Sequence, residues 1–187
     1  MEPGQVLLVH AAAGGLGQLL CRWASHLGAT VIGTVGAPAK QEVARSAGCA
    51  HVLLRTEEDV AARCMDLTGG QGVDVVYDSV GRDTVRQSLA CLRPGGHAIV
   101  CGAASGTVEN FSLEWLHARS CKISRPTVET YVRSREQLHT AARAVFDGMR
   151  AGVLRLRGIQ RFGLHEAADA HRALESRLAI LTPVLLP

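Results

Sequence analysis

Aromatic residues are scarce in this sequence, and it has no long apolar run and no cluster of basic residues. Phe, Trp and Tyr make up 4% of its 187 residues, and 20 Lys and Arg stand against 17 Asp and Glu for a formal net charge of +3. Nucleic-acid-binding domains typically combine a basic patch with exposed aromatic side chains, so the composition predicts no nucleic-acid partner. No stretch approaches the roughly 20 consecutive apolar residues of a membrane-spanning helix, so we expect no membrane partner.

The sequence also lacks any C-x-x-C pair, which disfavours a zinc site or a redox dithiol. Its six cysteines are widely separated, which suits a reducing compartment and free buried thiols. They are Cys21, Cys49, Cys64, Cys91, Cys101 and Cys121. The first residues, MEPGQ, have neither the charged start nor the apolar core of a signal peptide. We therefore expect a cytoplasmic protein without a metal site.

Apolar runs of strand length alternate with segments of helical period along most of the chain. The first pair is an apolar run over Gln5–Ala11 and a helical stripe with Leu20, Trp23 and Leu27 on one face. This alternation is typical of a parallel sheet covered by helices on both faces. The sequence predicts an α/β fold, a Rossmann-type doubly wound sheet of about six strands in three layers. The further strands are expected at 30–35, 51–55, 73–80, 97–102 and 121–128.

The expected helices carry recognisable start and stop signals. Thr56 is placed to cap a helix that begins with an acidic turn, and Ser134 with Gln137 forms a capping box at the start of the longest helix. Gly152 ends that helix, and the rhythm of the sequence changes there. We therefore expect a nucleotide-binding domain over 1–152 and a separate C-terminal segment over 153–187.

A small-residue turn joins the first strand to the first helix and is close to the G-x-G-x-x-G fingerprint. Ala12 takes the place of the first glycine, and Gly14 and Gly17 follow. In such a turn one glycine lets the backbone approach a pyrophosphate, another lets the helix pack on the strand, and the helix N–H groups face the anion. A tight turn without a ligand is the alternative, but the surrounding β/α series favours a nucleotide site.

The end of the second strand indicates which nucleotide binds. An NAD site is expected to carry an acidic residue about 20 residues after the glycine turn. The segment Gly33–Lys40 has none, and instead Lys40 begins the next helix while Arg55 ends the third strand. A missing carboxylate and an added cation favour a ribose 2′-phosphate, which predicts NADPH. The alternative for Lys40 is a solvated helix residue.

The ends of the fourth and fifth strands should open on the same edge of the sheet, where open α/β sheets bind ligands. The segments are Asp78–Gly81 and Cys101–Gly106, both rich in small residues. They leave room for the nicotinamide half of the cofactor, although the glycines could equally be ordinary turn residues.

Several motifs together resemble the quinone oxidoreductase (zeta-crystallin-like) branch of the zinc-independent medium-chain dehydrogenase/reductases. The resemblance extends from about Gly4 to Arg177. It is carried, in order, by HAAAGGLG, GTVGAPAK, VVYDSVGRDT, SLACLRPGGHAIVCGAASG, SRPT and ALESR. It implies NADPH-dependent hydride transfer to a quinone or a related α,β-unsaturated carbonyl compound.

The resemblance also implies roles for individual residues. Lys40 would hold the 2′-phosphate, and Arg177 would reach the same end of the cofactor. Arg55 and Cys101 depart from the family pattern, which often has tyrosine and phenylalanine there. The complete set expected to bind the cofactor is Ala13, Gly14, Gly15, Leu16, Gly17, Gly36, Lys40, Arg55, Ser79, Val80, Cys101, Gly102 and Arg177. We assign no catalytic side chain, because hydride passes directly between the nicotinamide and the substrate.

Family members carry a substrate domain ahead of the nucleotide domain, and their chain returns to it at the C-terminus. We therefore expect this chain to be a truncated form or gene fragment with little turnover alone, its apolar tail packed on itself or on a neighbour. The resemblance further implies a homodimer formed through the sheet edge at Cys121–Val128. A nucleotide-binding redox sensor or structural module without turnover and an enoyl-thioester reductase domain are the competing hypotheses.

Overall fold

A computed structural model describes residues 1–155, 158–176 and 181–187. The described chain forms two compact units, Met1–Leu154 and Arg155–Pro187. The first unit contains β1 (Val6–Val9), α1 (Gly15–His26), β2 (Thr30–Val35), η1 (Pro38–Lys40), α2 (Gln41–Ser46), β3 (His51–Leu54), α3 (Val60–Leu67), β4 (Val73–Asp78), α4 (Val85–Cys91), β5 (Leu92–Val100), α5 (Glu114–His117), β6 (Lys122–Ser124), α6 (Val128–Tyr131) and α7 (Arg135–Arg150). The second contains β7 (Ile159–Gly163), η2 (Leu164–Glu166), α8 (Ala167–Glu175) and β8 (Thr182–Leu186).

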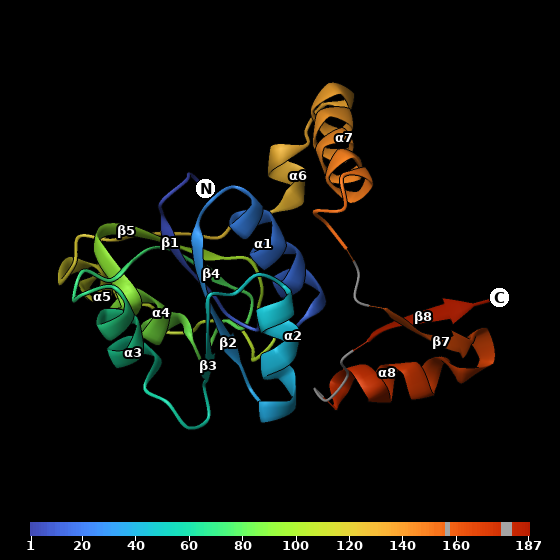
Figure 1. Cartoon of the computed structure of the whole chain (residues 1–187), viewed down its shortest axis with the longest axis horizontal. Helices are drawn as coiled ribbons and strands as arrows, with labels where there is room; N and C mark the ends of the chain where they lie inside the picture. The colour runs from blue at the N-terminus through green and yellow to red at the C-terminus, as the bar shows by residue number, and fades with distance from the viewer. Residues whose placement is uncertain (156–157, 177–180) are drawn as a thin grey trace. The chain divides into compact units, whose positions relative to one another are not determined.

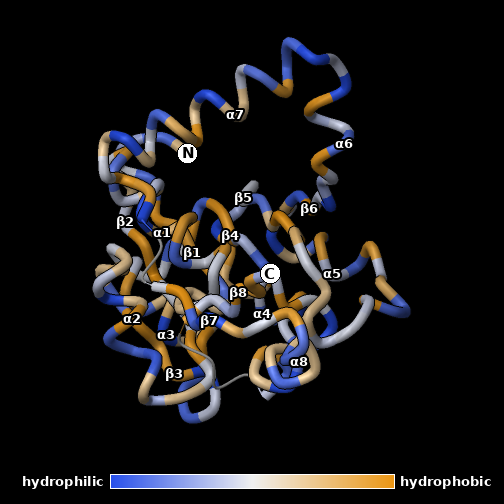
Figure 2. Tube along the Cα trace, turned by 90° about the vertical axis from the view of Figure 1, so that its right-hand side faces the viewer, coloured by the Kyte–Doolittle hydropathy of each residue, from blue (hydrophilic) through white to orange (hydrophobic). Residues whose placement is uncertain are grey.

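The first unit is built on a six-stranded parallel sheet in the order β3-β2-β1-β4-β5-β6. Figure 1 shows α3 and α4 on one side of these strands and α1 and α2 on the other. Successive residues of β1 face opposite sides, so Leu7 joins one apolar cluster and Leu8 the other. Residues of α1 and α2 complete the first cluster, and residues of α3 and α4 complete the second. The strands are therefore buried on both faces, and Figure 2 shows apolar positions gathered along them. The predicted three-layer α/β fold is confirmed.

A bulge lies in β5, which begins at Leu92 although the sequence predicted a strand only from residue 97. Val73 pairs with Leu92, but Val75 pairs with His97. A step of two residues along β4 is therefore matched by a step of five along β5, and the extra residues of β5 form the bulge. Its Arg93 donates from Nε to Asp74 Oδ1 at 2.6 Å, while Asp74 Oδ2 accepts the backbone N–H of Val6 at 2.8 Å. One carboxylate thus ties together the amino-terminal ends of β1, β4 and β5.

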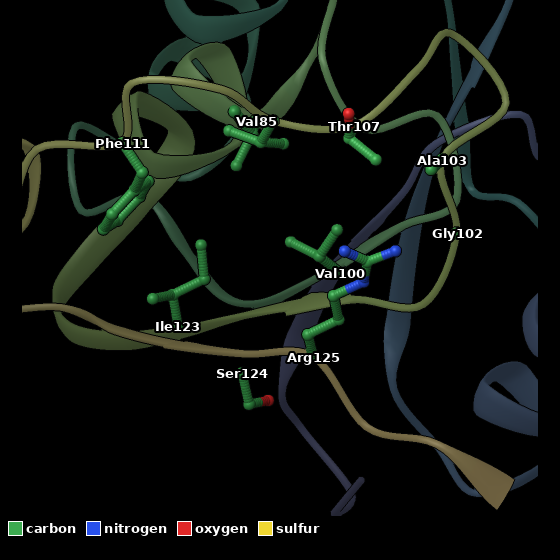
Figure 3. Close-up of a pocket in the computed structure, with 10 residues that line it drawn as sticks. Val85, Val100, Gly102, Ala103, Thr107, Phe111, Ile123, Ser124 and Arg125 are labelled. Carbon is green, nitrogen blue, oxygen red and sulfur yellow. The ribbon is translucent and has the colours of Figure 1, made fainter.

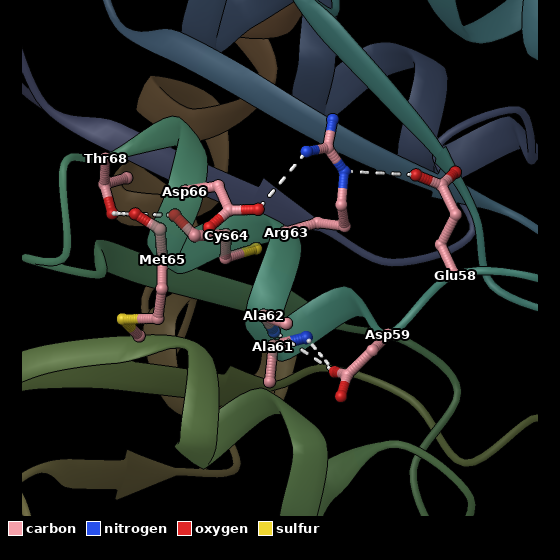
Figure 4. A network of polar contacts seen from close by, with 9 residues as sticks. All are labelled: Glu58, Asp59, Ala61, Ala62, Arg63, Cys64, Met65, Asp66 and Thr68. Carbon is pink, nitrogen blue, oxygen red and sulfur yellow. Dashed lines mark hydrogen bonds and ion pairs between the residues drawn. The ribbon is translucent and has the colours of Figure 1, made fainter.

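The caps of two helices test the start signals. Asp59, and not Thr56, caps α3, and its Oδ1 accepts the backbone N–H groups of Ala61 and Ala62 (Figure 4). Thr56 lies too early because the chain forms a turn over 55–57 before the helix begins. Ser134 and Gln137 form the predicted capping box of α7, which is confirmed.

The amphipathic helix α7 exposes much of its apolar face. Leu138, Val145, Phe146 and Met149 are each 46–56% exposed. Figure 2 shows apolar and polar positions alternating around this helix. Gly148 is buried, and its Cα faces the Trp23 ring so closely that an added Cβ would lie 2.7 Å from it.

In the second unit the two strands pair with each other. β7 and β8 run parallel, with Ile159 opposite Thr182 and Gly163 opposite Leu186, and α8 contacts both strands. The tail thus folds on itself. Within the described residues, no helix combines the length and apolar character that crossing a bilayer requires.

Candidate nucleotide-binding site

The predicted site residues gather at the carboxyl ends of five neighbouring parallel strands. Ala13–Gly17 follow β1, Gly36 and Lys40 follow β2, and Arg55 follows β3. Ser79 and Val80 follow β4, and Cys101 and Gly102 follow β5. Because parallel strands share one direction, these segments lie along one edge of the sheet. Arg177, the remaining member of the predicted set, lies outside the described residues.

The turn after β1 is compact and leads directly into α1. Ala11 has a positive φ of 51°, and Gly14 donates its N–H to the Ala11 carbonyl oxygen at 2.8 Å. Gly14 occupies the N-cap position of α1 without a side-chain hydrogen bond, and the first turn has no acidic residue. The first N–H groups of a helix have no intrahelical acceptors and carry the positive end of its dipole. This end of α1 therefore suits an anion such as a pyrophosphate.

Gly17 sets how closely α1 approaches this turn. A Cβ at this position would lie 2.3 Å from the Ala11 carbonyl oxygen and 2.8 Å from Ala12 Cα. Both contacts are to backbone, which cannot rotate away. Gly15 differs, because a Cβ there would meet nothing within 4 Å.

At the end of β2, Lys40 closes a short 3₁₀ turn and stands at the N-cap of α2. It is partly buried, and this burial lowers the pKa of its amine from the ordinary value of 10.5. Arg55 lies one strand further, where its backbone N–H donates to the Val35 carbonyl oxygen at 3.0 Å. The structure thus places both cations beside the end of β2.

Asp78 organises the loop that carries Ser79 and Val80. Its carboxylate is fully buried and accepts the backbone N–H groups of Val80 at 2.9 Å and Gly81 at 3.0 Å. It also accepts hydrogen bonds from two hydroxyl groups of α4. Thr84, the N-cap residue, donates at 2.8 Å, and Ser88, within the helix, donates at 2.7 Å. Sequence reasoning named Asp78 only as part of a loop. Hydroxyl residues six and ten positions later were the signal that it missed.

The loops after β4 and β5 pack backbone to backbone. The Cys101 N–H donates to the Asp78 carbonyl oxygen at 2.8 Å, and a Cβ on Gly102 would lie 2.5 Å from the Ser79 carbonyl oxygen. Burial raises the pKa of the Cys101 thiol, which keeps it protonated. The two loops therefore form one fixed wall at this end of the site.

His10, at the end of β1, is a second buried group that sequence reasoning did not single out. Its side chain is 1% exposed, and Nδ1 lies 3.0 Å from the Thr34 hydroxyl, while Nε2 is buried without a hydrogen-bond partner in the described structure. Burial lowers the pKa of His10 to about 4, which the nearby Arg55 reinforces and Asp78 opposes. The imidazole is therefore neutral near pH 7.

Similarity to known proteins identifies the family of this chain. The family model described as zinc-binding dehydrogenase matches residues 15–147. The chain belongs to this family. It is 44% identical to 2-haloacrylate reductase from a Burkholderia species and 40% identical to quinone oxidoreductase 1 of Escherichia coli, in each case over all of this chain. The chain spans 57% and 58% of the lengths of these two relatives.

Solved structures of related proteins share the fold of this member of the zinc-binding dehydrogenase family. A quinone oxidoreductase from Pseudomonas syringae superimposes with a TM-score of 0.96 at 39% identity, covering 100% of this chain and 58% of its own. The E. coli quinone oxidoreductase, solved as a complex with NADPH, gives 0.95 at 40% identity with the same coverage. The resemblance to quinone oxidoreductases is confirmed. Despite the family's name, the described residues contain no group of three or more His, Cys, Asp or Glu placed to hold a metal ion.

The first prediction concerns the two glycines of the α1 turn. Gly17→Ala should lower the free energy of unfolding by about 2–4 kcal/mol, because its methyl group meets fixed backbone. Gly15→Ala is the matched control and should change stability by less than about 1 kcal/mol. Urea unfolding monitored by circular dichroism measures both. Equal stability of the two variants would contradict the assigned close approach.

The second prediction follows from His10. The unfolded chain binds a proton at this residue near pH 6.5, whereas the folded chain does so only near pH 4, so stability falls as the pH drops through this window. His10 alone should account for a loss of about 2 kcal/mol between pH 7 and pH 5. Urea titrations at both values of pH, on the original chain and on His10→Gln, would measure it. A variant with an undiminished pH dependence would refute the assignment.

Proposed function

We propose that this chain binds NADPH along the carboxyl edge of its sheet, with residues 1–152 as the nucleotide-binding domain. The observation that carries the proposal is the combination of the α1 turn with two cations at the ends of β2 and β3. Neither Asp nor Glu occurs from Gly33 to Lys40, where an NAD site would place its ribose ligand. The relative solved with NADPH, at 40% identity, supports the same choice.

The residues present fit the parts of this cofactor. The pyrophosphate would lie against the N–H groups of Ala13–Leu16, where Gly14 and Gly15 leave the helix end open. Gly36 and Lys40 would face the ribose 2′-phosphate, with Arg55 beside them. At the other end the wall formed by Ser79, Val80, Cys101 and Gly102 would bound the nicotinamide. Arg177 is proposed to reach the phosphate end.

We assign to the chain a part in the reduction of a quinone or a related α,β-unsaturated carbonyl compound. The cofactor supplies the hydride, and the protein binds and orients both reactants. The names of the relatives, quinone oxidoreductase and 2-haloacrylate reductase, support a conjugated acceptor. Residues 153–187 are proposed to form the segment that returns to a substrate domain in the family. The free state of the cysteines in the described structure supports a cytoplasmic location.

The decisive measurement for the cofactor is the ratio of affinities for NADPH and NADH. The chain should prefer NADPH by tenfold or more, as measured by the fluorescence of the reduced nicotinamide. Lys40→Ala should weaken NADPH binding by about tenfold or more and leave NADH binding unchanged, because only NADPH carries the 2′-phosphate. Arg45→Ala, an exposed change on α2, serves as the control. Equal affinity for both cofactors, or a preference unaffected by Lys40→Ala, would overturn the assignment.

We also propose a homodimer through the edge strand β6 and its flanks, Cys121–Val128. β6 ends the sheet order and pairs with β5 alone among the described strands. An edge strand presents unpaired backbone groups to a second copy. Analytical ultracentrifugation should give a mass near twice the chain's 19.8 kDa at micromolar concentration. A mass of one chain at all concentrations would exclude this dimer.

A further inference from the structure

Two buried cysteines from different elements meet on one face of the sheet. Cys21 lies in α1 and is fully buried, whereas Cys49 lies in the turn between α2 and β3 and is 7% exposed. Their Sγ atoms are 3.4 Å apart, in hydrogen-bond contact. A disulfide bond is about 2.05 Å long, so bond formation needs an approach of roughly 1.4 Å. The sequence has no C-x-x-C pair, and only the fold brings these two thiols together.

The main chain beside Cys49 is already in contact with α1. At Gly48, whose φ is +99°, a Cβ would lie 2.9 Å from the Cβ of Ser25, one helical turn after Cys21. The N–H of Cys49 donates to the Ala44 carbonyl oxygen at 3.2 Å, which holds the turn against the end of α2. The remaining distance between the sulfur atoms therefore requires side-chain rotation and a small shift of this turn.

A surface pocket of about 260 Å³ opens beside the pair. Residues 46–48, which lead directly to Cys49, line one part of it, and Arg22, Ser25 and His26 of α1 line another. No carboxylate lines the pocket, and the Nε of Arg22 is buried without a hydrogen-bond partner in the described structure. A small oxidant thus has a place to approach the turn that carries Cys49.

The two thiols differ in how readily they react. The hydrogen bond with Cys49 and burial raise the pKa of the Cys21 thiol, although the cation of Arg22 opposes them. The thiolate is the form that attacks an oxidant, so Cys21 is held in its unreactive form. Cys49 is nearer the surface and is therefore the first thiol to react.

Cys49 also occupies space beside the turn that leads into α1. A Cβ on Gly33 of β2 would lie 2.6 Å from Cys49 Sγ and 2.7 Å from Ala12 Cβ, so these two side chains share the space over Gly33. Ala12 belongs to the turn, and its N–H donates to the Thr34 carbonyl oxygen at 2.9 Å. A shift of Cys49 toward Cys21 would empty part of this space and remove a contact that supports the turn.

We propose that Cys21 and Cys49 form a reversible disulfide when the chain meets a hydroperoxide, and that this bond weakens nucleotide binding at the neighbouring turn. The effect on binding rests on the proposed function, because Ala12 borders the proposed pyrophosphate site. The disulfide itself does not depend on that function. In a reducing compartment, disulfides of this kind are typically transient and serve redox sensing.

The hydroperoxide is the oxidant and is itself reduced. The sulfur of Cys49 attacks one peroxide oxygen, so that an S–O bond forms and the O–O bond breaks, and the thiol proton leaves with the other oxygen as an alcohol or as water. Cys21 then attacks the sulfenic sulfur of Cys49, the S–S bond forms, and the S–O bond breaks. The departing hydroxide takes the Cys21 proton and leaves as water. A dithiol reverses the bond by thiol–disulfide exchange.

Peptide mapping under non-reducing conditions tests the bond in the original chain. After treatment of the folded chain with hydrogen peroxide, mass spectrometry should find the peptides of Cys21 and Cys49 cross-linked, and dithiothreitol should release them. Cys101 is the competing site, because it alone among the six cysteines is not buried, and the next residue, Gly102, lines the cavity that Figure 3 shows. Oxidation confined to Cys101, or a cross-link that joins other cysteines and spares Cys21 and Cys49, would overturn the disulfide.

The effect on the nucleotide turn is measured by NADPH titration before oxidation and after it, once the peroxide has been removed. Oxidation should weaken NADPH binding to the original chain by about threefold or more, and dithiothreitol should restore it. Cys49→Ala cannot form the bond and should show no change on oxidation. Cys64→Ala, a fully buried cysteine of α3 on the other face of the sheet, is the matched control and should respond like the original chain.

Three results separate the parts of the proposal. Affinity that oxidation leaves unchanged in the original chain would refute the link between the disulfide and the turn. An equal fall in Cys49→Ala would refute it as well, because the loss would then have another origin. A chain that binds no NADPH in either state would contradict the proposed function, whereas the cross-link would still decide the disulfide.

Discussion

The contact between Gly17 and the backbone of Ala11 and Ala12 is the constraint on which the site depends. It lets α1 begin directly after the end of β1, so that the helix N-terminus lies at the carboxyl edge of the sheet. A side chain there would push the helix away from the strand, and the N–H groups would lose their position. The same principle recurs at Gly102, where the loops after β4 and β5 meet backbone to backbone. Close packing of main chain thus sets the geometry before any charged group contributes.

Buried polar groups then fix the loops without placing charge in the path of a ligand. Asp78 gathers two N–H groups and two hydroxyls around a fully buried carboxylate, so hydrogen-bond donors stabilise it, and none of the ion pairs among the described residues involves it. His10 stays neutral because burial disfavours its charged form. The charged residues of the proposed site that the structure describes, Lys40 and Arg55, stand nearer the surface. Such a division favours an anionic ligand that lies along the sheet edge.

The sequence predicted the layers and most strands, because buried parallel strands consist of apolar runs and the helices that cover them have apolar residues at helical spacing. It also predicted the α7 capping box, which depends only on local spacing at Ser134 and Gln137. It missed the bulge of β5, because Arg93–Gly96 has the residues of a turn, and only pairing with β4 keeps these residues within the strand. It likewise missed Asp78 and His10. The importance of His10 comes from burial and from Thr34, a neighbour distant in the chain, and no local pattern encodes these. For Asp78 the available signal was the pair of hydroxyl residues Thr84 and Ser88 that follow it.

The carboxylate of Asp74 makes the amino edge of the sheet different from the carboxyl edge, and the two edges differ in how well they tolerate substitutions. At the amino edge it ties β1, β4 and β5 together through Val6 and Arg93, so the strands are anchored there by side chains remote from the site. The carboxyl edge is relieved of that task and ends in loops. Substitutions in those loops can therefore retune what the molecule recognises while the scaffold keeps its register. The contacts that hold the strands in register and the loops that would contact a ligand therefore lie at opposite edges of the sheet. The contacts of Asp74 with Arg93 and Val6, at the amino edge, make this arrangement possible.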